Sequence, residues 1–115
     1  MSAVGCVFCR IAAGDPAEPA TVIQEWPDAL AIVPLGPVTP GHWLVIPRTH
    51  VRDAAERPEV TAATVYRAAE LIGETGDDVN LIVNVGTAAG QTVDHLHVHI
   101  VPRKAGDSLA LPWTR

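Results

Sequence analysis

The chain has 115 residues and a net charge of −5 at pH 7. This length is typical of one domain with one hydrophobic core, so we expect a single domain over residues 1–115, with a C-terminal tail from about residue 104. The negative charge argues against a nucleic-acid-binding surface, because phosphate backbones attract clustered Lys and Arg, and the 8 in this chain are scattered.

Hydropathy gives no sign of a membrane-spanning segment. No apolar run approaches the roughly 20 residues that a helix needs to cross a bilayer. The first residues, MSAVGCVFCR, lack the charged start and long apolar stretch of a secretory signal. We therefore predict a cytoplasmic protein that binds small molecules rather than membranes or nucleic acid.

The first half of the chain is patterned for strands. A short turn or helix is expected at residues 9–13. Residues 21–26 and 29–33 are predicted to form two strands, separated by a turn at Pro27 and Asp28. Residues 43–46 are predicted to form a third, buried strand, bounded by Gly41 and Pro47.

The clearest helix is predicted for residues 58–72. Pro58 suits the first helical position, and Glu59 suits the positive N-terminal end of a helix. Gly73 and Gly76 are expected to end the helix. One apolar stripe is expected to face the core, made of Ala62, Val65, Tyr66, Ala69 and Ile72.

The second half of the chain adds two more strands. Residues 79–85 are predicted to form a strand, and the small-residue loop GTAAGQTVD leads from it into a last strand that ends at Pro102. Strands that pair first as hairpins, then one helix, then two further strands indicate an α+β domain with an antiparallel sheet.

The last strand, within DHLHVHIVPR, holds three of the chain's 5 histidines. Side chains alternate between the two faces of a strand, so His95, His97 and His99 would share one face. A lone histidine there would most often be part of a solvent-facing surface. Three in register favour a functional site, because imidazole titrates near neutral pH, with an unperturbed pKa of about 6.5.

Cys6 and Cys9 form a C-x-x-C pair near the N-terminus. This spacing suggests a metal half-site or a redox pair rather than a structural disulfide. A thioredoxin-like redox motif would require a strand before the pair, and the sequence predicts none there. A zinc site needs two more ligands, for which His50 and one of the three clustered histidines are candidates. Two reduced cysteines that only pack remain an alternative.

The loop NVGTAAGQT, from Asn84 to Thr92, could hold an anion. Its small residues let backbone N–H groups approach a phosphate, and Asn84 and Thr92 could donate side-chain hydrogen bonds. Such a glycine-containing connection is most often only a turn. A phosphate held by it, however, would lie beside His97, whose neutral imidazole is a competent nucleophile toward phosphorus.

Three segments, CVFCRI, PGHWLVIPRTH and GQTVDHLHVHIVPR, resemble the histidine triad family of nucleotide hydrolases and transferases, whose motif is His-φ-His-φ-His-φ-φ with φ apolar. The resemblance extends from Cys6 to about Arg103. It implies an α+β fold with a five-stranded antiparallel sheet, one main helix and a short N-terminal helix, usually as a homodimer. It also implies a reaction at the α-phosphate of a nucleoside phosphoramidate or dinucleoside polyphosphate, through a nucleotidyl-histidine intermediate that releases AMP or a similar mononucleotide.

The resemblance assigns roles to the histidines. His97 matches the nucleophile, and His99 matches the third histidine, which helps to position the nucleophile and contacts phosphate. His42 matches an upstream histidine that supports the triad. The phosphate loop of the family matches Asn84, Gly90, Gln91 and Thr92, with Thr92 near the leaving group.

The resemblance also concerns metals. No catalytic metal is required, because the nucleophile is an imidazole. Members that begin with C-x-x-C bind a structural zinc, and the matching positions here are Cys6, Cys9, His50 and His95.

Two features depart from the family pattern or leave its branch open. Pro34 stands where many members carry the Asp or Asn that binds the ribose hydroxyls, so ribose preference is open. PRKAGD, after the triad, resembles the dinucleoside polyphosphate hydrolases, whereas the cysteine pair and the length resemble the zinc-containing general branch.

Trp113 is a candidate for reaching a partner subunit's site. Arg103 and Lys104 are expected to face solvent, although they could help to hold a polyphosphate tail.

Two other classes of function remain as alternatives. One is a nucleotide-binding regulatory protein whose hydrolysis is incidental. The other is a metal-binding protein in which the three histidines themselves hold zinc or copper. The second is disfavoured, because ligands at alternate positions of one strand converge poorly.

Overall fold

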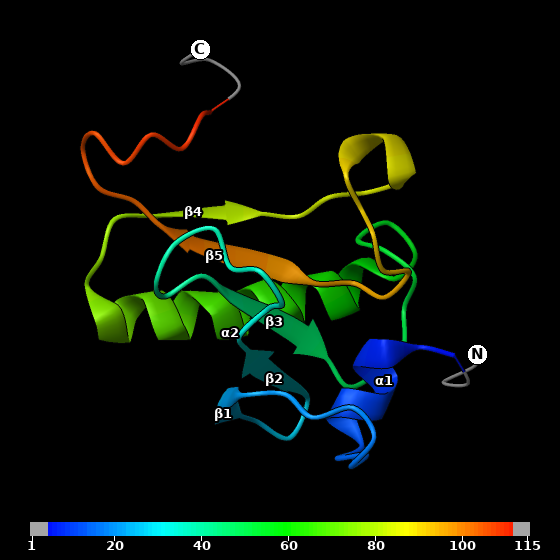
Figure 1. Ribbon diagram of the computed structural model, residues 1–115. Coiled ribbons are helices and arrows are strands. Elements are labelled where there is room, and N and C mark those ends of the chain that lie inside the picture. Colours follow the sequence, from blue (N-terminus) through cyan, green and yellow to red (C-terminus); the bar gives the residue numbers. More distant parts are fainter. Residues whose placement is uncertain (1–4, 112–115) are drawn as a thin grey trace.

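The computed structural model describes residues 5–111 and contains one antiparallel sheet (Figure 1). The strand order is β1-β2-β3-β5-β4. The predicted five-stranded antiparallel α+β architecture, with one main helix and a short N-terminal helix, is confirmed. The elements are α1 (Val7–Ala12), β1 (Val22–Glu25), β2 (Ala29–Ile32), β3 (Trp43–Pro47), α2 (Pro58–Thr75), β4 (Val79–Ile82), the 3-10 helix η1 (Thr87–Ala89) and β5 (Val98–Pro102).

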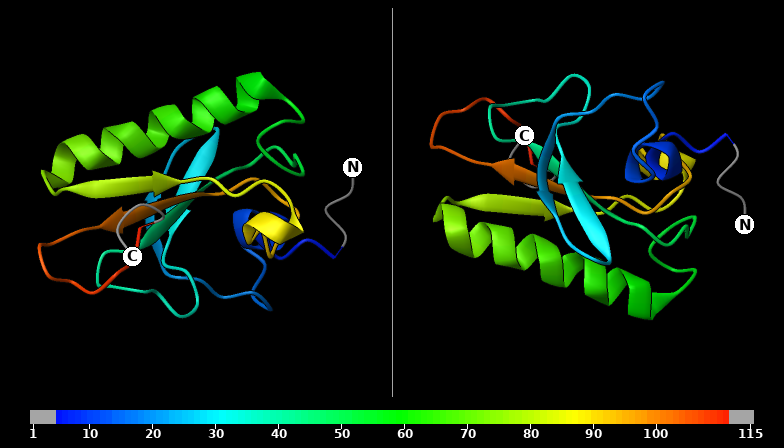
Figure 2. Two further views of the ribbon diagram at one scale, coloured as in Figure 1. Left: turned by 90° about the horizontal axis from the view of Figure 1, so that it is seen from above. Right: turned by 90° about the horizontal axis from the view of Figure 1, so that it is seen from below.

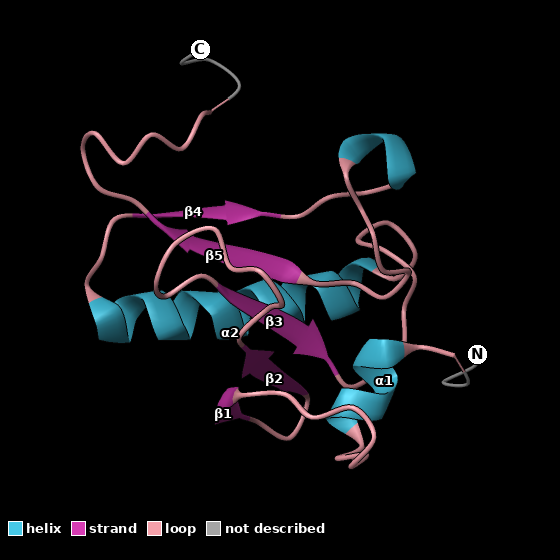
Figure 3. Ribbon diagram, viewed as in Figure 1, coloured by secondary structure: helices cyan, strands magenta, loops and turns pink. Residues whose placement is uncertain are grey.

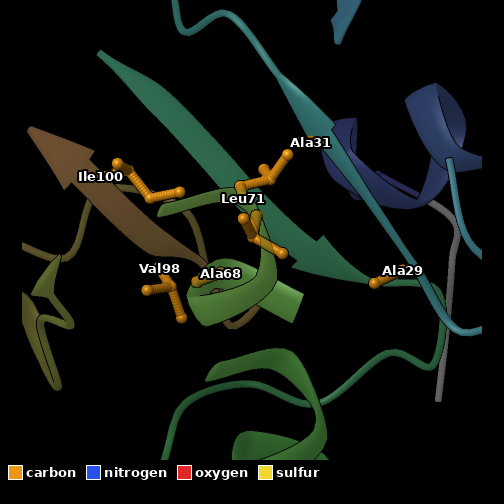
Figure 4. Close-up of a cluster of buried hydrophobic side chains, with 7 residues drawn as sticks. Ala29, Ala31, Ala68, Leu71, Val98 and Ile100 are labelled. Atoms are coloured by element: carbon orange, nitrogen blue, oxygen red, sulfur yellow. The ribbon is translucent and has the colours of Figure 1, made fainter. Parts of the chain in front are cut away.

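The two helices lie on opposite faces of the sheet (Figure 2). Helix α2 packs across β3 and β5, and Figure 4 shows the buried core beneath it. That core consists of Ala29, Ala31, Val45, Ala68, Leu71, Val98 and Ile100. The intervening strand residues point to the other face and pack with α1. This second cluster consists of Phe8, Leu30, Ile32, Leu44 and Ile46.

Helix α2 buries a stripe that overlaps the predicted one only in part: Val65 and Ile72 pack against the core as predicted, whereas Ala62 and Ala69 are exposed. Thr64, Ala68 and Leu71 are its buried residues, whereas Tyr66 is 62% exposed. Thr64 can be buried because its hydroxyl donates to the Val60 carbonyl within the helix, at 2.8 Å. The predicted core face therefore wrongly omitted Thr64.

The end of α2 also differs from the predicted one. The helix continues through Gly73 to Thr75 and is capped by Gly76, whose φ of 71° lies in the left-handed region. Gly73 only lowers helix propensity, by about 1 kcal/mol relative to Ala. Gly76 ends the helix because its backbone N–H donates to the Ile72 carbonyl in that conformation.

The last strand is shorter than predicted, and this changes the geometry of the histidines. β5 begins at Val98, so His99 is in the strand, whereas His95 and His97 precede it. Before the strand, the Leu96 N–H donates to the carbonyl of Val51, in the loop after β3, at 2.8 Å. The prediction that all three histidines share one strand face is therefore wrong.

The connection between β4 and β5 carries η1 and lies beyond the start of β5 (Figure 3). β4 itself ends at Ile82, three residues before the predicted limit of that strand. Residues 103–111 form no helix or strand. Between residues 5 and 111, no helix is both long and apolar enough to cross a bilayer.

Candidate functional site

Two thiols and two imidazoles meet where α1 packs beside the segment that leads into β5. The Nδ1 atom of His95 lies 3.3 Å from Cys6 Sγ, 3.5 Å from Cys9 Sγ and 3.2 Å from His50 Nδ1. Cys9 Sγ lies 3.2 Å from His50 Nδ1. All four ligand atoms lie within 4.8 Å of one another. The structure thus brings together the four residues predicted to bind a metal.

The ligand atoms of this cluster fit a cation with tetrahedral coordination. His95 Nε2 lies 2.8 Å from the Pro47 carbonyl oxygen, which can only accept, so the proton is on Nε2 and Nδ1 presents a lone pair to the cluster. Zinc bonds of about 2.0 Å to nitrogen and 2.3 Å to sulfur imply ligand separations of about 3.3 Å between two nitrogens and about 3.8 Å between two sulfurs. The four separations given above, 3.2 to 3.5 Å, lie close to those values.

Burial also sets the protonation of the ligand groups in this cluster. It lowers the pKa of His95 to about 4, which keeps the imidazole neutral as a metal ligand must be. Burial raises the pKa of the Cys9 thiol to about 11. A thiolate at Cys9 therefore needs a neighbouring positive charge, which a divalent cation would supply.

His97 lines a cavity. Its Nδ1 lies 2.8 Å from the backbone carbonyl oxygen of His95, so Nδ1 carries the proton and donates. The Nε2 atom of neutral His97 then has a free lone pair. Backbone geometry thus selects the tautomer that leaves a nucleophilic nitrogen for a ligand in the cavity.

His42 and His99 form a second chain of hydrogen bonds. The Val38 N–H donates to His42 Nδ1 at 3.1 Å, so the proton of neutral His42 is on Nε2. That Nε2 donates to His99 Nδ1 at 3.0 Å. His99 is left with a proton on Nε2, which makes it a hydrogen-bond donor next to His97, since their ring centroids are 5.2 Å apart.

The imidazoles of His42 and His99 are both held neutral. Burial lowers the pKa of His42. Burial, followed by the proximity of His97 and His42, lowers the pKa of His99 to about 4. At neutral pH His99 is therefore a neutral donor rather than a cation.

Phe8 is a site residue that sequence reasoning missed. Its side chain is only 7% exposed and packs edge-on against both His95 and His97, with ring centroids 5.8 and 5.2 Å apart. It thus contacts one residue of the Cys6, Cys9, His50 and His95 cluster and the His97 imidazole at once. The available signal was its position between Cys6 and Cys9 in the sequence.

The cavity beside His97 has a volume of about 750 Å³, within the range of small-molecule sites. His42, His97, His99 and Thr92 line it together with apolar walls from α1, β2 and the loop after β2. Pro34 is part of that wall and has no side-chain group that could bind a hydroxyl.

The predicted phosphate loop is held together mainly by its own hydrogen bonds. The buried Gln91 side chain accepts from the Gly86 N–H at 2.8 Å and donates to the carbonyls of Arg52 and Val93 at 2.7 and 3.0 Å. Asn84 Nδ2 donates to the Gly90 carbonyl at 3.5 Å. Of the four predicted loop residues, Thr92 lines the cavity, and the other three shape the loop behind it.

Arg103 does not face solvent freely, contrary to prediction. It forms an ion pair with Asp107 at 2.8 Å and donates to Asn80 Oδ1 at 2.7 Å. The guanidinium, with two backbone N–H groups, holds the pKa of Asp107 well below its usual range. Arg103 therefore anchors the segment after β5. Trp113 lies outside the described residues.

Comparison with known proteins identifies the family. A family model for the HIT domain matches residues 15–106. The adenylylsulfatase HINT3 of Arabidopsis thaliana is 39% identical over 110 residues, which cover 90% of this chain and 55% of that protein. This chain thus spans little more than half the length of that relative. The adenosine 5'-monophosphoramidase hnt1 of Schizosaccharomyces pombe is 33% identical over 104 residues, which cover 87% of this chain and 75% of that protein.

A solved structure agrees with this assignment. A zinc-bound histidine triad family protein from Mycobacterium smegmatis matches with a TM-score of 0.81 and 40% identity, over 96% of this chain and 83% of that one. The sheet, helices and histidine motif thus correspond to a known fold. The chain belongs to the HIT (histidine triad) family.

Proposed function

We propose that the chain is a nucleotide hydrolase or transferase that cleaves the bond between the α-phosphate of a nucleotide and its leaving group, with His97 as the nucleophile. The observation that carries this proposal is the hydrogen bond from His97 Nδ1 to the His95 carbonyl, which leaves Nε2 free at the cavity. Nucleoside phosphoramidates and dinucleoside polyphosphates are the substrates we expect. The names of the two relatives, an adenylylsulfatase and an adenosine 5'-monophosphoramidase, support chemistry at an adenylyl group.

The reaction has two steps. In the first, the His97 Nε2 lone pair forms a bond to the α-phosphorus as the bond to the leaving group breaks, and the leaving group takes up a proton from solvent. In the second, water attacks the same phosphorus, the P–N bond breaks, and the water releases a proton. Splitting the displacement in this way replaces one difficult attack by water with two easier steps.

The neighbouring side chains have supporting roles in this proposal. His99 Nε2–H donates to a non-bridging phosphate oxygen, and His42 holds His99 in the required tautomer. The Thr92 hydroxyl donates to the leaving group at the cavity rim. Asn84, Gly90 and Gln91 hold the loop that presents Thr92 and its backbone N–H groups to the phosphate.

The variant His97→Asn tests the role of the nucleophile. An Asn side-chain N–H can replace Nδ1–H as donor to the His95 carbonyl, but it offers no nucleophilic nitrogen. We expect hydrolysis of adenosine 5'-phosphoramidate to fall at least about 1,000-fold, with AMP affinity and the urea unfolding midpoint nearly unchanged. Full turnover by the variant would exclude His97 as nucleophile.

We also propose that the Cys6, Cys9, His50 and His95 cluster holds one structural zinc, which ties α1 to the segment before β5. The matching ligand separations and the His95 tautomer support this. Elemental analysis of purified protein should find about one zinc per chain, lost in Cys6→Ser/Cys9→Ser. A metal-free protein with native spectra would contradict the assignment.

A homodimer is the assembly we propose. Its support is the exposure of apolar side chains: Leu81 and Ile82 on the edge strand β4 are about two-fifths exposed, and Tyr66 on α2 is more exposed still. Sedimentation analysis should give twice the chain mass, and Leu81→Lys should shift it toward the monomer. A wild-type monomer at high concentration would contradict this. The cytoplasmic location stays a prediction.

A further inference from the structure

The cavity contains one acidic side chain, and neither the reaction nor the metal cluster uses it. Among the described residues that line the cavity, Glu18 is the only acidic residue, and no Lys or Arg is present. The walls around it are apolar. A carboxylate in such a wall can only accept hydrogen bonds, so it favours ligand groups that donate.

Glu18 is held in place from two directions. Arg10 Nη2 lies 2.9 Å from Glu18 Oε1, and the Glu18 side chain is 26% exposed. The Asp15 carbonyl accepts from the Glu18 N–H at 3.0 Å, which fixes the backbone of this loop. Only Oε1 of Glu18 takes part in the ion pair with Arg10. Further lone pairs on both oxygens are therefore available to a ligand.

The order of residues along α1 indicates which part of a nucleotide reaches Glu18. Phe8 touches His97, and Ile11 lies one turn further along the same wall. The loop that carries Glu18 follows the far end of this helix (Figure 1). With the α-phosphorus at His97, a nucleoside would lie against Phe8 and Ile11, and the outer edge of its base would face Glu18.

We propose that Glu18 reads the base of the nucleotide, by accepting hydrogen bonds from N–H groups on its outer edge. Guanine fits best, because its N1–H and N2–H groups are adjacent and match the two oxygens of one carboxylate. Adenine offers a single amino group, and unsubstituted purine offers no donor on that edge. This inference rests on the proposed nucleotide-binding function and adds the base to it.

Binding of two monophosphates tests the inference without requiring turnover. Calorimetry should find that GMP binds wild-type protein at least about tenfold more tightly than purine riboside 5'-monophosphate, the effect of one charge-assisted hydrogen bond. Glu18→Ala should bring the two affinities within about threefold by weakening GMP binding. Glu18→Gln, which keeps the size but replaces one acceptor by a donor, should also lose the preference. The matched control Glu74→Ala removes an exposed carboxylate on α2 and should keep it.

Each contrary result has one meaning. Equal affinities for the two ligands in wild-type protein, or the same preference in wild type and Glu18→Ala, would overturn the inference. A Glu18→Ala effect on the difference between GMP and 2'-deoxy-GMP, with base preference unchanged, would assign Glu18 to the ribose and also overturn it. Failure of the proposed function looks different: the base preference would be present in binding, but no nucleoside phosphoramidate would be hydrolysed.

Discussion

Replacing Phe8 by Ala should destabilise the protein because this ring links the core to both histidine sites. The side chain is 7% exposed and belongs to the cluster on the α1 face of the sheet. Buried Phe-to-Ala replacements cost about 3 to 5 kcal/mol. We expect the upper half of that range, because the ring also loses edge-on contacts with His95 and His97, each worth about 0.5 to 1.5 kcal/mol.

Phe8→Leu separates the two contributions. Leu keeps most of the apolar volume but has no ring edge to place against the imidazoles, so the expected loss is about 1 to 2 kcal/mol. Leu35→Ala is a matched control, since Leu35 is fully exposed, and should change stability by less than about 0.5 kcal/mol.

Urea unfolding at pH 7.5, followed by circular dichroism, measures these differences. The m-value should stay the same, so that the shift in midpoint reports stability alone. A Phe8→Leu variant as stable as wild type would show that the ring edges contribute nothing. A loss of less than about 1 kcal/mol for Phe8→Ala would refute the packing argument.

Three further predictions concern protons, metal and loop geometry. The pKa of His99 is lowered to about 4 from an unfolded value of about 6.5. Between these two pH values the unfolded chain therefore binds more protons than the folded protein. The contribution of His99 to the unfolding free energy is complete above about pH 6.5 and is lost as the pH falls toward 4. His99→Gln should flatten that pH dependence in denaturant titrations, and an unchanged slope would contradict the assignment. Chelation of metal should lower the thermal midpoint of wild type but not of Cys6→Ser/Cys9→Ser; equal midpoint shifts in both would exclude this cluster. Gly90 has a φ of 97°, so Gly90→Ala should cost about 1 to 2 kcal/mol of unfolding free energy, whereas Ala88→Gly should cost less; equal costs would contradict the strain argument.

Sequence patterns predicted the sheet, because it depends on residue type and spacing. The four residues that the family resemblance implies as metal ligands do lie together in the structure. Sequence patterns failed where hydrogen bonds between distant segments determine the local structure. His95 and His97 alternate as in a strand, yet the Val51 carbonyl binds the Leu96 N–H and delays the strand to Val98. No local signal reveals a carbonyl that lies far away in the sequence.

The face of α2 shows a second limit. Tyr66 seemed suited to the core, and Thr64 did not, but the structure exposes the first and buries the second. The Thr64 hydroxyl satisfies itself within the helix, which removes the usual cost of burial. Gln91 is similar: its type suits substrate binding, while its actual partners are backbone groups of the loop and of Arg52.

The central claim is that His97 Nε2 attacks phosphorus. The most direct measurement is intact-mass spectrometry of protein quenched within seconds of mixing with adenosine 5'-phosphoramidate, followed by peptide mapping. The account predicts an adenylyl adduct on His97 that decays as AMP appears, and no adduct in His97→Asn. AMP release without any adduct, or an adduct on another residue, would contradict it.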